Sequence, residues 1–309
     1  MNELVSIIIP AYKAANYLAE AIDSALAQSY PNIEIIVVND GSPDNGATRD
    51  VAMQYRDRIR YFEKENGGCA SALNYGIQIM NGEWFSWLSH DDLYYSNKIS
   101  VLISLLQKYN REQEKIILGC NYNILNAHGV IKSNIFDNST GLMTPEKAFG
   151  ETLNVSTFNG CGLLIPKRAF LECGIFRTDY RHLLDREMWM RFAYHGYTYL
   201  FSSEPLVINR THGEQVTVKA KDALYSEEEQ LIDEYTELLN ESRKVSFLRE
   251  LMYFAYKRKH YSKGKRIKEL LKEKNDFDFH TEALVAKYTI EGKAKSLIRD
   301  AYKSILRHR

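Results

Sequence analysis

Short apolar segments alternate with segments of helical periodicity through the N-terminal third of the chain. We predict buried strands at Val5–Ile9 (closed by Pro10), Ile33–Val38, Ile59–Glu63 and Trp84–Leu88. The helices between them are expected at about residues 18–26, 47–55 and 69–80. Continuous apolar strands that alternate with helices indicate a parallel sheet with right-handed crossovers. The fold class predicted is therefore α/β, with a mostly parallel sheet wound by helices.

The pattern becomes less regular after a helix expected over Asn97–Tyr109. Strands are expected over 116–125 and 130–136, as a hairpin, over the Gly-rich residues 158–165, and over 197–201 and 206–209. Helices are expected from Thr144 and over 167–173 and 183–195. From about Ala220 onward the sequence is helical, with Lys-rich faces and no strand signal. We therefore predict a domain over residues 1–217 and a helical extension over 218–309.

Composition and cysteine usage predict a cytoplasmic protein. The charged residues, 26% of the total, are typical of a globular chain. No secretory h-region follows Met1, and no apolar run approaches the roughly 18 residues of a membrane span. The four cysteines have no metal-site spacing and are read as free thiols in a reducing compartment.

Charge is distributed unevenly although the net charge is zero. Residues 243–309 contain 19 Lys/Arg against 8 Asp/Glu, so this part carries +11 and the remainder −11. One interpretation is a solvated basic face. The other is that residues 257–266, with Tyr256 and Tyr261 interleaved, approach an anionic membrane surface from the inner side of the cell membrane. Nucleic acid is the weaker candidate partner.

Polar clusters follow each strand of the predicted sheet, at Tyr12, Asp40, Asn66 and the pair Asp91–Asp92. The carboxyl ends of parallel strands share one edge, so these clusters are expected to lie together and form a site. Adjacent carboxylates repel unless they are neutralised, and Mg²⁺ or Mn²⁺ with oxygen ligands would do so. The alternative is that Asp91 and Asp92 only lead into the next helix.

The order of these motifs resembles the family 2 glycosyltransferases, inverting enzymes with the A-type nucleotide-sugar-binding fold. The resemblance covers about residues 4–217. Val5 to Tyr12, with Pro10, resembles the opening strand, whose Tyr stacks on the nucleotide base. Val38 to Ser42 resembles the segment whose Asp, here Asp40, bonds the base. Asn66-Gly67-Gly68 resembles the next turn, with Leu73 where many members have Arg.

The acidic motifs carry the rest of the resemblance. Ser89-His90-Asp91-Asp92 is similar to the metal motif and implies that Asp91 bonds the ribose and Asp92 the metal. Asp185, preceded by Leu184 in place of the usual Glu, matches the catalytic base; taken alone it is a carboxylate at a helix N-terminus. Arg210-Thr211-His212, with Gln215 to Thr217, resembles the closing segment beside the diphosphate. His212 is then a metal ligand, a phosphate donor or a structural residue.

These observations predict a metal-dependent inverting glycosyltransferase with Mn²⁺ or Mg²⁺ as cofactor. Its donor would be a nucleotide-sugar, with a UDP-sugar favoured, and its acceptor a saccharide or lipid-linked saccharide of bacterial surface polysaccharide. Asn159, Gly160 and Gly162 are candidates for the acceptor side, because glycine lets a ligand approach the backbone. The alternatives are a non-catalytic nucleotide-sugar-binding protein of the same fold, or a sugar nucleotidyltransferase.

Overall fold

A computed structural model describes residues 3–109, 115–126, 129, 131–134, 141–153, 158–212, 221–276, 282–283, 285–286 and 290. The chain divides into two compact units, Met1–Lys221 and Asp222–Arg309. They are called here the catalytic unit and the helical unit. The division falls four residues beyond the predicted boundary, after a segment outside the described residues.

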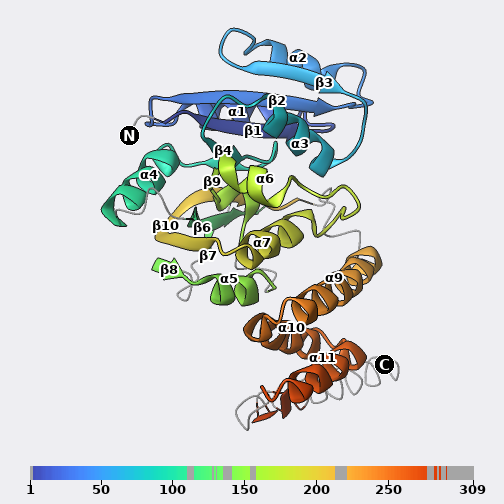
Figure 1. The fold of residues 1–309 in the computed structure, drawn as a ribbon. Coiled ribbons are helices and arrows are strands. Elements are labelled where there is room, and N and C mark those ends of the chain that lie inside the picture. The colour runs from blue at the N-terminus through green and yellow to red at the C-terminus, as the bar shows by residue number, and fades with distance from the viewer. Residues whose placement is uncertain are drawn as a thin grey trace, which may run out of the picture. The chain divides into compact units, whose positions relative to one another are not determined.

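The first sheet of the catalytic unit is mostly parallel, as the sequence predicts (Figure 1). Its strands are, in spatial order, β3 (Arg60–Lys64), β2 (Ile33–Asp40), β1 (Val5–Ala11), β4 (Trp84–Trp87) and β9 (Ile165–Pro166). Only β9 runs antiparallel to its neighbour. Strand β1 continues through Pro10 instead of ending there, because Pro10 lies beyond the last pair of the β1–β4 ladder, Ile8 opposite Trp87.

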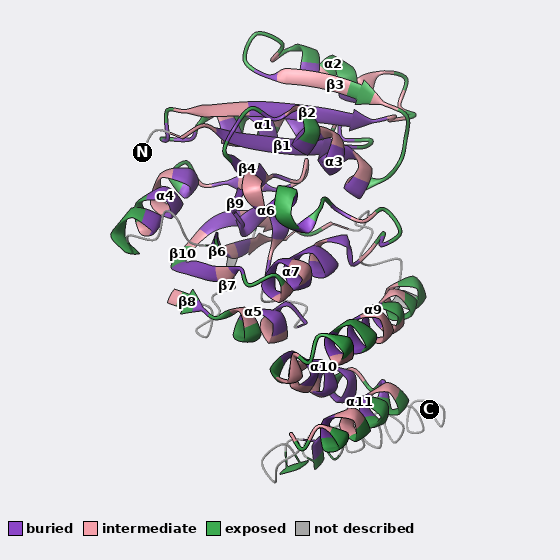
Figure 2. Cartoon of the chain, viewed as in Figure 1, coloured by how far each residue is buried: buried purple, intermediate pink, exposed green. Residues whose placement is uncertain are grey.

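Helices cover this sheet where the periodicity predicts them. They are α1 (Leu18–Leu26), α2 (Ala47–Met53) and α3 (Cys69–Ile79). Helix α4 (Lys98–Tyr109) also forms as predicted, but it packs on the second sheet, which is described below. Strand β1 is buried along its whole length (Figure 2). Helix α3 approaches it at Gly76, where an added Cβ would lie 2.5 Å from Ile8 Cγ2. The absence of a side chain at Gly76 thus lets α3 pack directly on β1.

A second sheet completes the catalytic unit and differs in detail from the prediction. Its order is β5 (Leu93–Tyr94), β10 (Thr198–Arg210), β6 (Ile116–Leu125) and β7 (Ile131–Asn134), with β8 (Gly141–Met143) also paired to β10. The two strands predicted over 197–201 and 206–209 form the single strand β10, with irregular register between Ser202 and Val207. Strands β5 and β8 were not predicted. Of the predicted hairpin, Val130 and residues 135–136 lie outside the described residues.

The predicted Gly-rich strand over residues 158–165 is wrong for most of its length. A 3₁₀ turn, η2 (Gly160–Gly162), forms instead and leads to β9. The side chain of Asn159 caps the turn by accepting a hydrogen bond from Cys161 N. Gly160 packs on Trp87, where an added Cβ would lie 2.6 Å from the ring. The helices of this half are α5 (Pro145–Thr152), α6 (Lys167–Cys173) and α7 (Leu184–Tyr194).

The helical unit contains α9 (Lys221–Glu241), α10 (Val245–Lys257) and α11 (Tyr261–Glu273). Acidic side chains of α9 meet basic side chains from the α10–α11 region. Glu228 pairs with Arg258 at 2.7 Å, and Asp233 pairs with Lys263 at 2.5 Å. Within the described part of the chain, no helix is both long enough and apolar enough to cross a membrane.

Candidate active site

Asp92, in the turn after β4, is almost fully buried and is held by several protein donors. Its Oδ1 accepts a hydrogen bond from the backbone N of Arg210 at 2.9 Å. Its Oδ2 accepts from Cys161 Sγ at 3.3 Å and Asn209 Nδ2 at 3.4 Å. Burial, and then the negative charge of neighbouring Asp91, raise the pKa of Asp92 to about 7. The surroundings therefore disfavour the charged form of Asp92.

Asp91 faces the last described residues after β10. Its Oδ2 lies 3.0 Å from His212 Nε2, and both side chains keep some exposure, 15% and 17%. The ring of His212 packs beside Tyr17, and its buried Nδ1 has no hydrogen-bond partner among the residues that the structure describes. Arg210 helps to hold the backbone of Asp91 in place, because its Nε donates a hydrogen bond to Asp91 O at 3.0 Å. The structure thus brings His212 to Asp91, whereas the sequence predicts Asp92 and His212 as the metal ligands. Gln215 to Thr217 lie outside the described residues.

The hydrogen-bonded atoms of Asp91 and His212 have the spacing that two adjacent ligands of a divalent cation would have. Mg²⁺ takes octahedral ligands at about 2.1 Å, so two neighbouring ligand atoms lie about 3.0 Å apart. The observed separation of the two side-chain atoms is 3.0 Å. Among the residues that the structure describes, no group of three or more His, Cys, Asp or Glu is arranged to hold a metal. Two side chains are fewer ligands than a cage made only of protein supplies, and Mg²⁺ commonly completes its shell with water and substrate phosphates.

Asp40, at the end of β2, organises the turn that precedes α3. The carboxylate is buried and accepts from Gly67 N at 3.0 Å and Gly68 N at 2.7 Å. Lys64 Nζ lies 2.7 Å from it, and Asn66 Nδ2 donates to its carbonyl oxygen at 2.9 Å. Asp40 and Asn66, predicted from separate motifs, are therefore in direct contact.

Tyr12 and Pro10, the other residues predicted for nucleotide binding, lie at the end of β1. Tyr12 is 41% exposed, whereas Pro10 is buried within the strand. The ring of Tyr12 is therefore available to a ligand at the same sheet edge.

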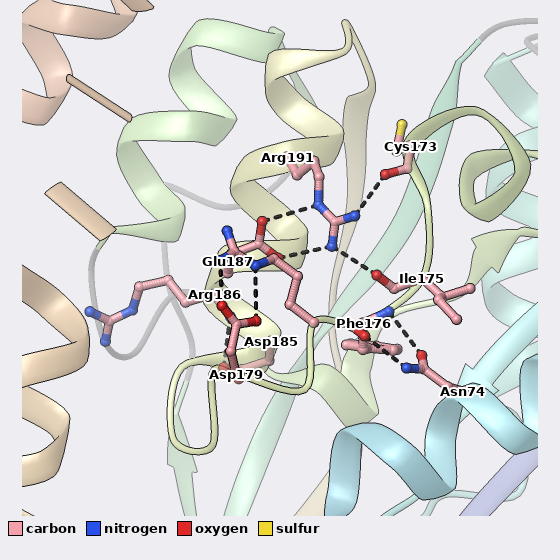
Figure 3. A network of polar contacts seen from close by, with 10 residues as sticks. Asn74, Cys173, Ile175, Phe176, Asp179, Asp185, Arg186, Glu187 and Arg191 are labelled. Atoms are coloured by element: carbon pink, nitrogen blue, oxygen red, sulfur yellow. Dashed lines mark hydrogen bonds and ion pairs between the residues drawn. The ribbon is translucent and has the colours of Figure 1, made fainter. Parts of the chain in front are cut away.

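Asp185 lies in the first turn of α7, where its Oδ1 accepts from Arg186 N at 2.7 Å (Figure 3). Desolvation by the surrounding protein raises the pKa of this carboxyl above its ordinary value, and the positive charge of Arg186 opposes the rise. A carboxylate with a raised pKa at a helix N-terminus can accept a proton from a bound hydroxyl.

Arg191 and Asn74 hold the segment that leads into α7 (Figure 3). Arg191 pairs with buried Glu187 at 2.9 Å and donates to the carbonyl oxygens of Cys173 and Ile175. Asn74, on α3, exchanges two hydrogen bonds with the backbone of Phe176. Helices α3 and α7 are therefore fixed relative to each other. These contacts were not predicted from the sequence. The i, i+4 spacing of Glu187 and Arg191 on a predicted helix could have indicated their ion pair.

Asp40, Asp91 and Asp185 each lie close enough to the thiol of Cys69, at the start of α3, to act on it electrostatically. Burial raises the pKa of Cys69, and each of these three carboxylates raises it further. Residues predicted for base binding, ribose binding and catalysis thus lie within electrostatic reach of one atom, although 145 positions separate the first from the last. His90, next to Asp91, is partly buried, and desolvation lowers its pKa.

The two sheets, with acidic strand ends around α3, form the A-type glycosyltransferase fold. Residues 6–174 match the family model described as glycosyl transferase family 2. The uncharacterized glycosyltransferase RT0329 of Rickettsia typhi is 45% identical over 72% of this chain and 69% of its own length. The chain therefore belongs to glycosyl transferase family 2 and is a glycosyltransferase.

Other relatives match shorter shares of their length. An uncharacterized glycosyltransferase of Rickettsia felis is 46% identical over 70% of this chain, which spans 35% of that protein. The minor teichoic acid biosynthesis protein GgaB of Bacillus subtilis is 35% identical over 35% of this chain and 12% of its own length.

Solved structures of S. aureus TarS share the fold. TarS 1–349 is 17% identical with a TM-score of 0.64, over 82% of this chain and 72% of that one. Its complex with UDP-GlcNAc is 15% identical with a TM-score of 0.63, over 93% of this chain and 88% of that one. These likenesses confirm the predicted fold class.

Proposed function

We propose that this chain is a metal-dependent, inverting glycosyltransferase that transfers a sugar from a UDP-sugar to a hydroxyl group in bacterial surface polysaccharide or glycoconjugate synthesis. The observation that carries the proposal is that Asp40, Asp91 and Asp185 all lie within electrostatic reach of the Cys69 thiol. A nucleotide site, a diphosphate site and a proton acceptor would then share one cleft. The TarS structure with UDP-GlcNAc supports a UDP-sugar donor, and the match to GgaB supports a surface-polymer acceptor.

The donor nucleotide would bind along the ends of β1 and β2. Asp40 is buried and already accepts hydrogen bonds from the Gly67–Gly68 turn, so its main role would be to order that turn. Exposed Asn66 and Tyr12 would then meet the base, Tyr12 by stacking on it.

The cation would be held by Asp91 and His212, in place of the predicted pair Asp92 and His212. When bound, it would neutralise the negative charge that develops on the departing diphosphate. The proximity of Asp91 Oδ2 and His212 Nε2 supports this revised assignment. Asp92 is a weaker candidate ligand because protein donors already occupy both of its carboxylate oxygens.

Asp185 would act as the base. It takes the proton from the acceptor hydroxyl while that oxygen forms a bond to the anomeric carbon. The bond from the anomeric carbon to the β-phosphate oxygen breaks, and UDP leaves from the opposite face of the sugar, which inverts the configuration. The raised pKa of Asp185 suits a proton acceptor.

A thermal-shift panel of UDP, GDP, ADP and UDP-sugars, each with Mn²⁺ or EDTA, tests the donor and the cation. We expect UDP with Mn²⁺ to stabilise the protein most, by about 2.7 kcal/mol at a hundredfold excess over Kd. Asp91→Asn should remove the Mn²⁺-dependent part of the shift, whereas Asp50→Asn, an exposed acid of α2, should not. Preference for another nucleotide, or equal shifts in Mn²⁺ and EDTA, would contradict the proposal.

The rival functions give different results in the same samples. A non-catalytic binding protein would show the UDP shift but no hydrolysis of the UDP-sugar on long incubation with Mn²⁺. A sugar nucleotidyltransferase would release pyrophosphate from UTP and a sugar phosphate. The end of β1 and the residue after it, Pro10-Ala11-Tyr12, argue against this second rival because they contain no Gly-rich basic phosphate loop.

A further inference from the structure

A closed ring of hydrogen-bonding side chains lies behind the Asp91–His212 pair. Asp92 Oδ2 accepts from Cys161 Sγ at 3.3 Å and from Asn209 Nδ2 at 3.4 Å. Asn159 joins these two donors, because its Oδ1 accepts from Cys161 N at 2.8 Å and its Nδ2 donates to Asn209 Oδ1. We call Asp92, Asn159, Cys161 and Asn209 the polar ring.

The polar ring connects three segments that are distant in the sequence. Asp92 belongs to the turn between β4 and β5, Asn159 and Cys161 to the region of η2, and Asn209 to the end of β10. Ser89 adds a further hydrogen bond between the first two segments, because its backbone N donates to Cys161 Sγ at 3.3 Å. Each residue of the ring is buried or partly buried, so water competes little for these bonds.

The polar ring also determines where Asp91 and His212 lie. Asp91 is the residue before Asp92, and His212 follows the ring residue Asn209 by three positions. Asp92 Oδ1 accepts from Arg210 N at 2.9 Å, which fastens the end of β10 to the acidic turn. Arg210 returns a second bond from its Nε to the backbone oxygen of Asp91. A shift of either segment would separate the two side-chain atoms that now lie 3.0 Å apart.

We propose that Asp92 is a positioning residue, which acts through the polar ring to hold Asp91 and His212 at the spacing that binds the divalent cation. The proposal rests on the function proposed above, and it gives Asp92 a different task from cation ligation. The carboxylate of Asp92 faces donors on both oxygens, whereas Asp91 and His212 are the more exposed pair. Residues that orient metal ligands commonly change metal affinity by about 10- to 100-fold when they are replaced.

An exchange of side chains between positions 92 and 209 tests this role. In Asp92→Asn the new amide nitrogen meets the amide of Asn209, so a donor faces a donor. In the double variant Asp92→Asn/Asn209→Asp, the amide introduced at position 92 can donate to the carboxylate introduced at position 209. That carboxylate still accepts from Asn159. The exchange therefore restores the hydrogen bond between positions 92 and 209 without returning a carboxylate to position 92.

The measurement is Mn²⁺ affinity in the presence of UDP, from the electron paramagnetic resonance signal of free Mn²⁺, with UDP affinity in EDTA measured separately. We expect Asp92→Asn to weaken Mn²⁺ affinity about 10- to 100-fold and to leave UDP affinity in EDTA unchanged. The exchange variant should regain the larger part of the loss. If the exchange variant binds Mn²⁺ as weakly as Asp92→Asn does, Asp92 is a ligand and the proposal is overturned. Unchanged Mn²⁺ affinity in Asp92→Asn would overturn it as well.

Cys161→Ala supplies a second variant that keeps the carboxylate and removes one neutral donor. We expect Mn²⁺ affinity to fall about two- to fivefold, because one weak hydrogen bond is lost. Unchanged Mn²⁺ affinity would contradict the ring. If the parent chain binds neither UDP nor Mn²⁺, the function proposed above has failed, whereas failure of the ring leaves the parent chain fully able to bind both.

Discussion

The catalytic unit and the helical unit use buried charge in opposite ways. In the helical unit, Glu228 is fully buried and meets Arg258 at 2.7 Å and His260 at 3.4 Å. In the catalytic unit, Asp185 receives a hydrogen bond from the backbone of Arg186, and its pKa is raised. Glu228 has a cationic partner, Arg258, that compensates its burial, whereas Asp185 keeps a carboxylate for which the surroundings favour a proton.

The contrast separates charges that hold a fold from charges available for chemistry. A buried carboxylate paired with an opposite charge helps to hold the fold in place but is a poor proton acceptor, because the opposite charge lowers its affinity for a proton. A carboxylate with a raised pKa costs stability but can accept a proton near neutral pH. The predictions below test whether the two units obey this division.

The largest effect is expected at Asp185. We expect Asp185→Asn to lower turnover by about 10²- to 10⁴-fold, the range of general base catalysis, while UDP affinity in Mn²⁺ stays near that of the parent chain. The substitution keeps an oxygen for the bond from Arg186 N. A radiolabelled transfer assay and a UDP titration measure the two quantities.

The pH dependence gives a second view of the same residue. The raised pKa of Asp185 means that the base is protonated, and turnover falls, at a higher pH than for an ordinary carboxyl group. The acidic limb of kcat against pH should therefore disappear from the residual activity of Asp185→Asn. Asp179→Asn, a control on the same segment whose side chain is 53% exposed, should keep both turnover and the limb. If Asp179→Asn lost turnover while Asp185→Asn kept it, Asp185 would not be the catalytic base.

The next effect is expected in the helical unit. Glu228→Gln removes one member of a buried charge group and should destabilise this unit by about 3 kcal/mol. Hydrogen exchange of peptides from α9 to α11 should become about a hundredfold faster, since 1.4 kcal/mol corresponds to tenfold. UDP affinity should not change. Glu237→Gln is the matched control, because its pair with Arg266 is exposed and should contribute at most about 1 kcal/mol.

The sequence predicts the first sheet and its helices well because their signals are local. Apolar runs marked β1, β2 and β4, and helical spacing marked α1 and α3. The errors depend on tertiary contacts. Residues 158–165 contain the apolar positions of a strand, but Gly160 packs on Trp87 and Asn159 caps a 3₁₀ turn. Strands β5 and β8 are too short, at two and three residues, to show a period of two.

The rule that the carboxyl ends of parallel strands share one edge of the sheet predicts which residues approach the site, but not which atoms are in contact. It brings Asp40, Asn66 and Asp91 to one edge, where the structure has them. It gives no means to choose between Asp91 and Asp92 as the partner of His212, because the direction of adjacent side chains in a turn depends on its backbone conformation. The three protein donors to Asp92 hold its carboxylate away from His212 and leave Asp91 as the partner. They belong to segments that are 69 or more positions away in the sequence.

A smaller effect is expected at Lys98, a buried charge of the catalytic unit whose amino nitrogen contacts neutral groups. Its Nζ lies 2.7 Å from Ser86 Oγ and 3.8 Å from the ring centroid of Tyr94. Burial lowers the pKa of Lys98 from 10.5 to about 8. Between these two pH values the unfolded chain binds the proton more tightly, so the stability of the catalytic unit should rise as pH rises from 8 to 10.5.

Lys98→Met should therefore stabilise the catalytic unit below pH 8, by about 1–2 kcal/mol after the lost hydrogen bonds are considered. It should also flatten the rise between pH 8 and 10.5. Denaturant unfolding followed by tryptophan fluorescence reports on this unit, which contains all three tryptophans. A destabilised Met variant with an unchanged pH profile would show that Lys98 is compensated as fully as Arg258.

The smallest effect concerns the helical unit and anionic membranes, where pairing of charges decides the outcome. Lys263 is 2.5 Å from Asp233, so this pair contributes no net charge to a surface, whereas Lys265 is exposed. If the predicted membrane association occurs, Lys265→Ala should weaken partition onto phosphatidylserine vesicles by about 1 kcal/mol, or about fivefold. The double variant Lys263→Ala/Asp233→Ala removes a neutral pair and should leave partition unchanged. Co-sedimentation that does not depend on phosphatidylserine content would exclude an electrostatic association, and the basic residues would then be a solvated face of helices held together by their own ion pairs.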